Sequence, residues 1–67
     1  MNHRIALLRL PDVQKLTGLS RSSIYRLEAL GEFPKRVRLS ERAVAWREED
    51  LVKWNETRPQ VDEHQAA

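Results

Sequence analysis

The chain has 67 residues, no cysteine and a formal net charge of +2. A chain this short buries only about 60% of the surface that its unfolded state exposes, which allows one small domain and leaves no room for a second domain to form a catalytic cleft. The absence of cysteine excludes disulfides and a thiolate zinc site as supplements to the small core. We therefore expect one folded domain that is not an enzyme and needs no cofactor.

Metal and membrane chemistry have little support in the sequence. His3 and His64 lie near opposite ends of the chain without a ligand cluster between them, so we expect no metal site. No apolar run approaches the roughly 20 residues that a membrane span needs, so we expect no membrane contact and a cytoplasmic protein.

The first thirty residues carry signals of a short strand and two helices. Residues 5–8 are an apolar run too short for a helix, which can form a short strand or lie against the core. A proline in the first turn and a glycine stop predict a helix over residues 11–17. Ser20 is well placed to cap a second helix that runs to about residue 30 and ends at Gly31. This arrangement is typical of a helix-turn-helix.

The predicted second helix has an apolar and a polar face. Ile24, Leu27 and Leu30 fall on one stripe, which we expect to face the core. Arg26 lies on the flank of the helix. The opposite face carries Arg21, Ser22, Tyr25 and Ala29.

After Pro34 the apolar period changes from 3.6 to 2, which predicts a β-hairpin. Its turn is expected at residues 40–42, with Arg42 at or near the tip and Arg38 and Arg47 facing outward. The alternating apolar residues are Val37, Leu39, Val44 and Trp46.

Acidic residues at positions 48–50 predict the start of a third helix, since they favour the positive end of the helix dipole. Leu51 and Trp54, with Val52 nearby, can anchor this helix on the core, and Pro59 ends it. We expect Trp54 and Trp46 to be core residues instead of stacking platforms for single strands. The domain is thus predicted over residues 1–58, followed by a disordered tail over residues 59–67.

These elements in this order predict a small α+β domain, a winged helix-turn-helix. The charge distribution agrees with a polyanion partner, because residues 21–47 hold seven basic and three acidic residues, whereas residues from 48 onward hold two basic and six acidic ones. We interpret the domain as a binder of double-stranded DNA, with the second helix in the major groove. The candidate recognition-helix residues are Ser20, Arg21, Ser22, Tyr25 and Arg26, and those of the wing and its flank are Lys35, Arg36, Arg38 and Arg42.

Each of these residues also has a simpler interpretation. Arg21 and Arg26 can be ordinary solvated surface residues, and Tyr25 can cover the edge of the core with its hydroxyl group in water. Topology and charge together favour DNA binding over this alternative, with Arg21 in the first helical turn as the best candidate for a base contact.

The segment LPDVQKLTGLSRSSIYRL (residues 10–27), followed by GEFPK (31–35), VRL (37–39) and RAVAWR (42–47), resembles the AlpA family of prophage regulatory proteins. The resemblance covers about residues 8–54 and implies a MerR-like winged-helix fold, related to excisionases. It places the five recognition-helix candidates on the family's recognition-helix block and Arg42 on the arginine that follows the wing tip. The family commonly has glycine where this chain has Ser40 and Glu41, and a carboxylate there argues against close insertion of the wing between phosphates.

The resemblance implies a nucleoid-associated regulator of an integrated element that binds DNA and activates transcription. Two alternatives stay open. One is an excision factor that bends attachment-site DNA, and the other is a protein-interaction module that docks on a recombinase or a signalling protein. An integrase, or another copy of the chain on adjacent sites, is a further expected partner.

Overall fold

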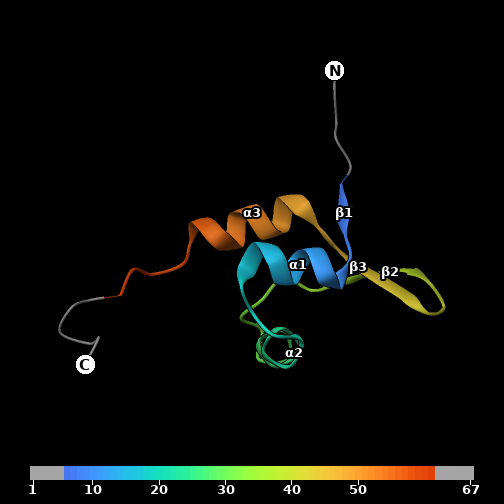
Figure 1. Cartoon of the computed structure of the whole chain (residues 1–67), viewed down its shortest axis with the longest axis horizontal. Helices are drawn as coiled ribbons and strands as arrows, with labels where there is room; N and C mark the ends of the chain where they lie inside the picture. Colours follow the sequence, from blue (N-terminus) through green and yellow to red (C-terminus); the bar gives the residue numbers. More distant parts are fainter. Residues whose placement is uncertain (1–5, 62–67) are drawn as a thin grey trace, which may run out of the picture.

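The computed structural model describes residues 6–61 and contains three helices and a three-stranded sheet. Helices α1 and α3 lie beside the sheet, and α2 is seen nearly end-on across α1 from α3 (Figure 1). The β2–β3 hairpin projects away from the helices as a wing. In chain order the elements are β1 (Leu7–Leu8), α1 (Leu10–Thr17), α2 (Arg21–Ala29), β2 (Val37–Ser40), β3 (Ala43–Arg47) and α3 (Glu48–Glu56). This confirms the predicted winged helix-turn-helix.

Two glycines with positive φ end the first two helices. Gly18 has φ 75° and donates its N–H to the carbonyl of Gln14 at 2.8 Å. Gly31 has φ 77° and donates to Glu28 at 3.0 Å, while Glu32 donates to the carbonyl of Leu27 at 2.8 Å. This pair of bonds is the Schellman arrangement, which favours glycine because a side chain is strained at such φ values. Both predicted helix ends are confirmed.

The sheet is antiparallel with the strand order β1-β3-β2, so β3 is the central strand. Its central place explains why the adjacent residues Ala45 and Trp46 are both fully buried. The turn is shorter than predicted, because Ser40 pairs with Ala43 and belongs to β2. A register shift between Arg38 and Ser40 accompanies this pairing and leaves Leu39 45% exposed, so its predicted inward position is wrong.

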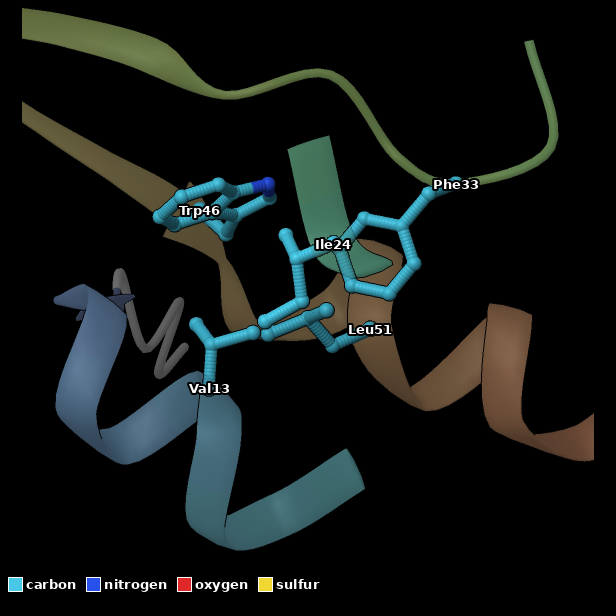
Figure 2. Packing of buried hydrophobic residues seen from close by; sticks show 5 residues of the cluster. All are labelled: Val13, Ile24, Phe33, Trp46 and Leu51. Carbon is cyan, nitrogen blue, oxygen red and sulfur yellow. The ribbon is translucent and has the colours of Figure 1, made fainter. Parts of the chain in front are cut away.

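The core is a cluster with at least one side chain from each helix, one from β3 and one from the loop before β2 (Figure 2). Trp46 is fully buried, as predicted, and its indole Nε1 donates to the carbonyl of Pro34 at 3.1 Å. The buried cluster consists of Val13, Ile24, Phe33, Trp46 and Leu51.

Three predicted core residues lie closer to solvent than expected. Leu30 is 63% exposed, because α2 has already ended and Phe33 supplies the buried side chain that follows it. Val52 is 50% exposed. Trp54 is half-buried and packs edge-on against Phe33 with ring centroids 4.8 Å apart, while its Nε1 donates to the carbonyl of Glu32 at 2.8 Å.

Some predictions fall outside the described residues. These are His3, His64 and most of the predicted tail, whose last six residues, 62–67, are not described. Within residues 6–61, no helix is long and apolar enough to cross a membrane.

Candidate nucleic-acid interface

The first turn of α2 places two polar side chains in solvent. Arg21 and Ser22 are exposed there, one and two positions after the cap residue. Ser20 is the cap itself, because its Oγ accepts the backbone N–H of Ser23 at 3.2 Å and lies 3.0 Å from the Ser23 hydroxyl. Ser20 therefore fixes the start of the helix, while Arg21 and Ser22 remain accessible to a ligand.

Tyr25 links α2 to the core and to two arginines. The sequence placed it on the open face of the helix, but the structure half-buries it against Trp46, with ring centroids 6.2 Å apart. The guanidinium carbon of Arg21 lies 5.7 Å from the centre of the Tyr25 ring, and that of Arg36 lies 4.9 Å from it. The ring thus orients two cationic side chains along one surface.

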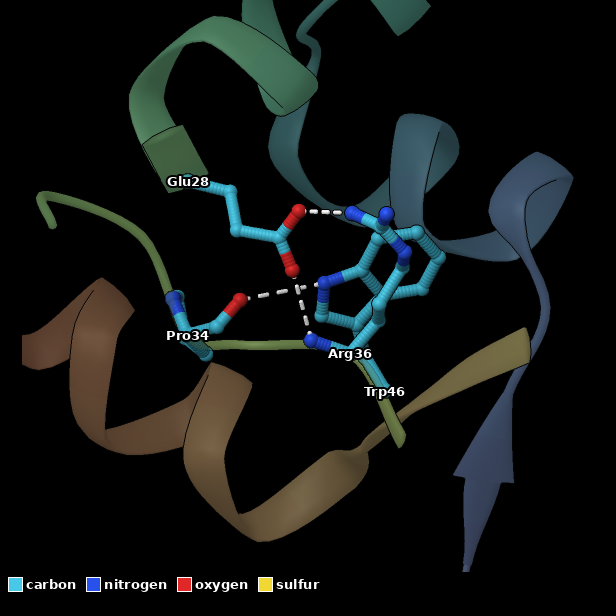
Figure 3. A network of polar contacts seen from close by, with 4 residues as sticks. All are labelled: Glu28, Pro34, Arg36 and Trp46. Atoms are coloured by element: carbon cyan, nitrogen blue, oxygen red, sulfur yellow. Dashed lines mark hydrogen bonds and ion pairs between the residues drawn. The ribbon is translucent and has the colours of Figure 1, made fainter. Parts of the chain in front are cut away.

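Arg36 is tied to α2 by the carboxylate of Glu28. The backbone N–H of Arg36 donates to Glu28 Oε2 at 2.7 Å, and Arg36 Nη1 pairs with Glu28 Oε1 (Figure 3). The Trp46 indole Nε1 donates to the carbonyl of Pro34, which lies two residues before Arg36. These contacts fix the loop that leads from α2 into the wing.

The basic residues of the wing differ in what holds them. Arg38 Nη1 donates to the carbonyl of Glu41 at 3.1 Å and so braces the turn of the hairpin. Arg42 lies in this turn and is exposed, and Lys35, near the end of the loop before β2, is exposed as well. Arg26 is exposed on α2.

An open hollow of about 800 Å³ lies between α2 and the base of the wing. It brings together four of the predicted residues, Tyr25, Lys35, Arg36 and Arg38, and adds Glu28 and Ala29. Arg21 and Ser22 stand at the other end of α2, and Arg42 at the tip of the hairpin. The hollow therefore joins four of the predicted residues of α2 and the wing, and the other predicted residues lie outside its lining.

Glu28 is the residue of this surface that sequence reasoning missed. Eight positions separate it from Arg36, with a glycine turn between them. Neither helical nor strand periodicity predicts a contact between a helix residue and a loop residue eight positions later. The available signal was that Glu28 is the one acid on the predicted second helix, within a segment that is otherwise mostly basic.

The arrangement defines the class of protein as a small winged helix-turn-helix domain, with a basic surface along its second helix and wing. Comparison with known proteins identifies the family. The family described as "Prophage CP4-57 regulatory protein (AlpA)" matches residues 6–59, and the chain belongs to this family.

A relative from Enterobacteria phage P4 supports this assignment. The chain is 49% identical over 47 residues to that phage's "Uncharacterized protein ORF88". The matched part is 70% of this chain and 53% of ORF88, so the chain spans about half the length of this relative.

Proposed function

We propose that the chain is a sequence-specific DNA-binding regulator of transcription in a prophage or mobile element. Membership of a family of prophage regulatory proteins supports the regulatory role. The observation that carries DNA binding is the exposed first turn of α2, on a helix whose other end lines a basic hollow. A major groove admits one helix, and the first turn of a recognition helix is the part that reaches base edges.

The structure suggests a division of roles on this surface. Arg21 contacts base edges, because its guanidinium can donate two hydrogen bonds to guanine. Ser22 and Arg26 contact phosphates or bases beside it, while Ser20 and Tyr25 position the helix and its arginines. The cations Lys35, Arg38 and Arg42 contact the phosphate backbone along the wing.

A titration of two fluorescent duplexes tests the proposal. One duplex comes from the region around the gene and the nearest integrase gene, and the other has an unrelated sequence. Tighter binding to the local duplex that persists at higher salt is the expected result, because base contacts add to the salt-sensitive phosphate term. Weak binding to both duplexes that disappears with salt would contradict sequence-specific recognition.

A related role, left open as an alternative by the sequence, is that of an excision factor that bends attachment-site DNA. Several phased sites in one target region and a bend in the bound duplex would favour it over a local activator. A circular-permutation mobility assay on the local duplex separates the two roles. Binding of further copies to adjacent sites, or of an integrase, would raise the affinity in either role.

A surface on the other side of the domain favours a second candidate function, docking on another protein. A hollow of about 240 Å³ lies between α1 and α3, and Leu16 and Val52 on its lining are 62% and 50% exposed. Glu48 and Glu56 also line it. Binding to a purified recombinase without any binding to DNA at low salt would place this function first.

A further inference from the structure

A carboxylate lies inside the basic hollow between α2 and the wing. Of the described residues that line the hollow, Lys35, Arg36 and Arg38 are basic and Glu28 is acidic. The Glu28 side chain is only 10% exposed, so solvent screens its charge weakly. A negative charge at this place opposes the approach of a polyanion.

The two oxygens of Glu28 hold two different groups of Arg36. One oxygen accepts the backbone N–H at 2.7 Å, and the other pairs with the guanidinium. The guanidinium also lies over the Tyr25 ring, 4.9 Å from its centre. Arg36 is therefore tied to α2 by its charge, although its side chain is still 41% exposed, whereas the exposed Lys35 beside it forms no ion pair with a described carboxylate. Within residues 6–61 this is the only ion pair.

We propose that Glu28 is a positioning residue that withholds Arg36 from the DNA backbone and thereby limits the sequence-independent part of the affinity. This inference rests on the proposed function. Each phosphate that a protein neutralises changes the slope of log K against log salt by about −0.9. A guanidinium that is already paired with a carboxylate does not add to that count, so the hollow contacts fewer phosphates than its basic residues suggest.

Glu28→Gln tests the proposal on a duplex of unrelated sequence. The glutamine oxygen can still accept the Arg36 backbone N–H, but the charge that holds the guanidinium is lost. We expect the affinity to rise about threefold to tenfold and the salt slope to become steeper by about 0.9. Glu56→Gln is the matched control, because it makes the same change in net charge on α3. Equal effects of the two substitutions, or weaker binding by Glu28→Gln, would overturn the proposal.

The double variant Glu28→Gln/Arg36→Gln identifies the source of the gain. If the released Arg36 makes the new phosphate contact, the double variant returns to the affinity and salt slope of the wild type. A double variant that keeps the gain would show that Glu28 acts by general repulsion, and the proposed role through Arg36 would be wrong.

Two variants that leave Glu28 in place keep the test independent of the folding of Glu28→Gln. Lys35→Gln should make the salt slope shallower by about 0.9, because this exposed cation contacts a phosphate. Arg36→Gln should leave the slope unchanged, because its charge is already withheld, although the unpaired Glu28 carboxylate that it leaves should lower the affinity for every duplex. Equal losses of slope in both variants would overturn the proposal. Near-UV circular dichroism of the buried Trp46 checks that each variant is folded.

The outcomes separate the inference from the function on which it rests. If the wild-type chain binds no duplex at low salt, both are wrong. If the wild type binds DNA but the Glu28 and Arg36 variants behave like their controls, the proposed function stands and the inference alone is wrong.

Discussion

The two ends of α2 differ in how their side chains are held. At the first turn, Arg21 and Ser22 are exposed, and only the cap residue Ser20 is hydrogen-bonded to the helix backbone. At the last turn, Leu27 packs on the core, and Glu28 is 10% exposed and bound to the loop that enters the wing. One short helix thus exposes side chains to solvent at one end and fixes the loop into the wing at the other.

We expect the largest effect from removing the buried side chain that supports α2 and the loop into the wing. Trp46→Ala removes a fully buried side chain that contacts Tyr25 and holds the Pro34 carbonyl. We expect a loss of about 3–5 kcal/mol in the free energy of unfolding, enough to unfold much of so small a domain. Chemical denaturation measures it. Trp54→Ala is the comparison, and an equal loss there would contradict the central place of Trp46, because Trp54 is only half-buried.

Arg21→Ala, in the exposed first turn of α2, should weaken DNA binding and leave the stability of the fold almost unchanged. The substitution should cost about 1–3 kcal/mol of binding on the specific duplex and relax the sequence preference. Its effect on the free energy of unfolding should stay within about 0.5 kcal/mol, because the side chain is exposed. Titrations of the local and the unrelated duplex, together with thermal unfolding, measure both. A large loss of stability with unchanged sequence preference would show that Arg21 has a structural role.

Ser20→Ala should reduce stability at the same end of the helix without removing a contact to DNA bases. Because its Oγ accepts the Ser23 N–H, we expect a loss of about 0.5–2 kcal/mol in the free energy of unfolding. Ser22→Ala is the matched control, since Ser22 is an exposed serine two positions later. Equal stability of the two variants in urea denaturation would show that the cap contributes nothing.

Much of the fold follows from local signals that the sequence displays. Gly18 and Gly31 correctly predicted where the first two helices end, because a positive φ at a helix end is a local requirement. The change of apolar period after Pro34 predicted the hairpin, and acidic residues marked the first turn of α3. Each of these signals acts within a few residues, so no tertiary information is needed to interpret them.

The sequence-based predictions fail where strand pairing and tertiary packing determine whether a side chain is buried or which residue it contacts. Leu39 is exposed because of the register shift in β2, and Ala45 is buried because β3 is the central strand. Neither fact can be obtained from a hairpin considered alone, since both depend on which strands pair. The bond between Glu28 and Arg36 is of the same kind, because it joins a helix to the loop after the following turn.

The smallest expected effect belongs to the wing tip. Arg42 is exposed in the turn of the β2–β3 hairpin, which projects away from the helices (Figure 1). Arg42→Ala should weaken binding to all duplexes alike and make the salt slope shallower by about one unit, because a phosphate contact carries no sequence information. Titrations of both duplexes at several salt concentrations measure this effect. If Arg21→Ala and Arg42→Ala cause equal losses on both duplexes, α2 does not read bases, and its two ends do not differ in the way proposed.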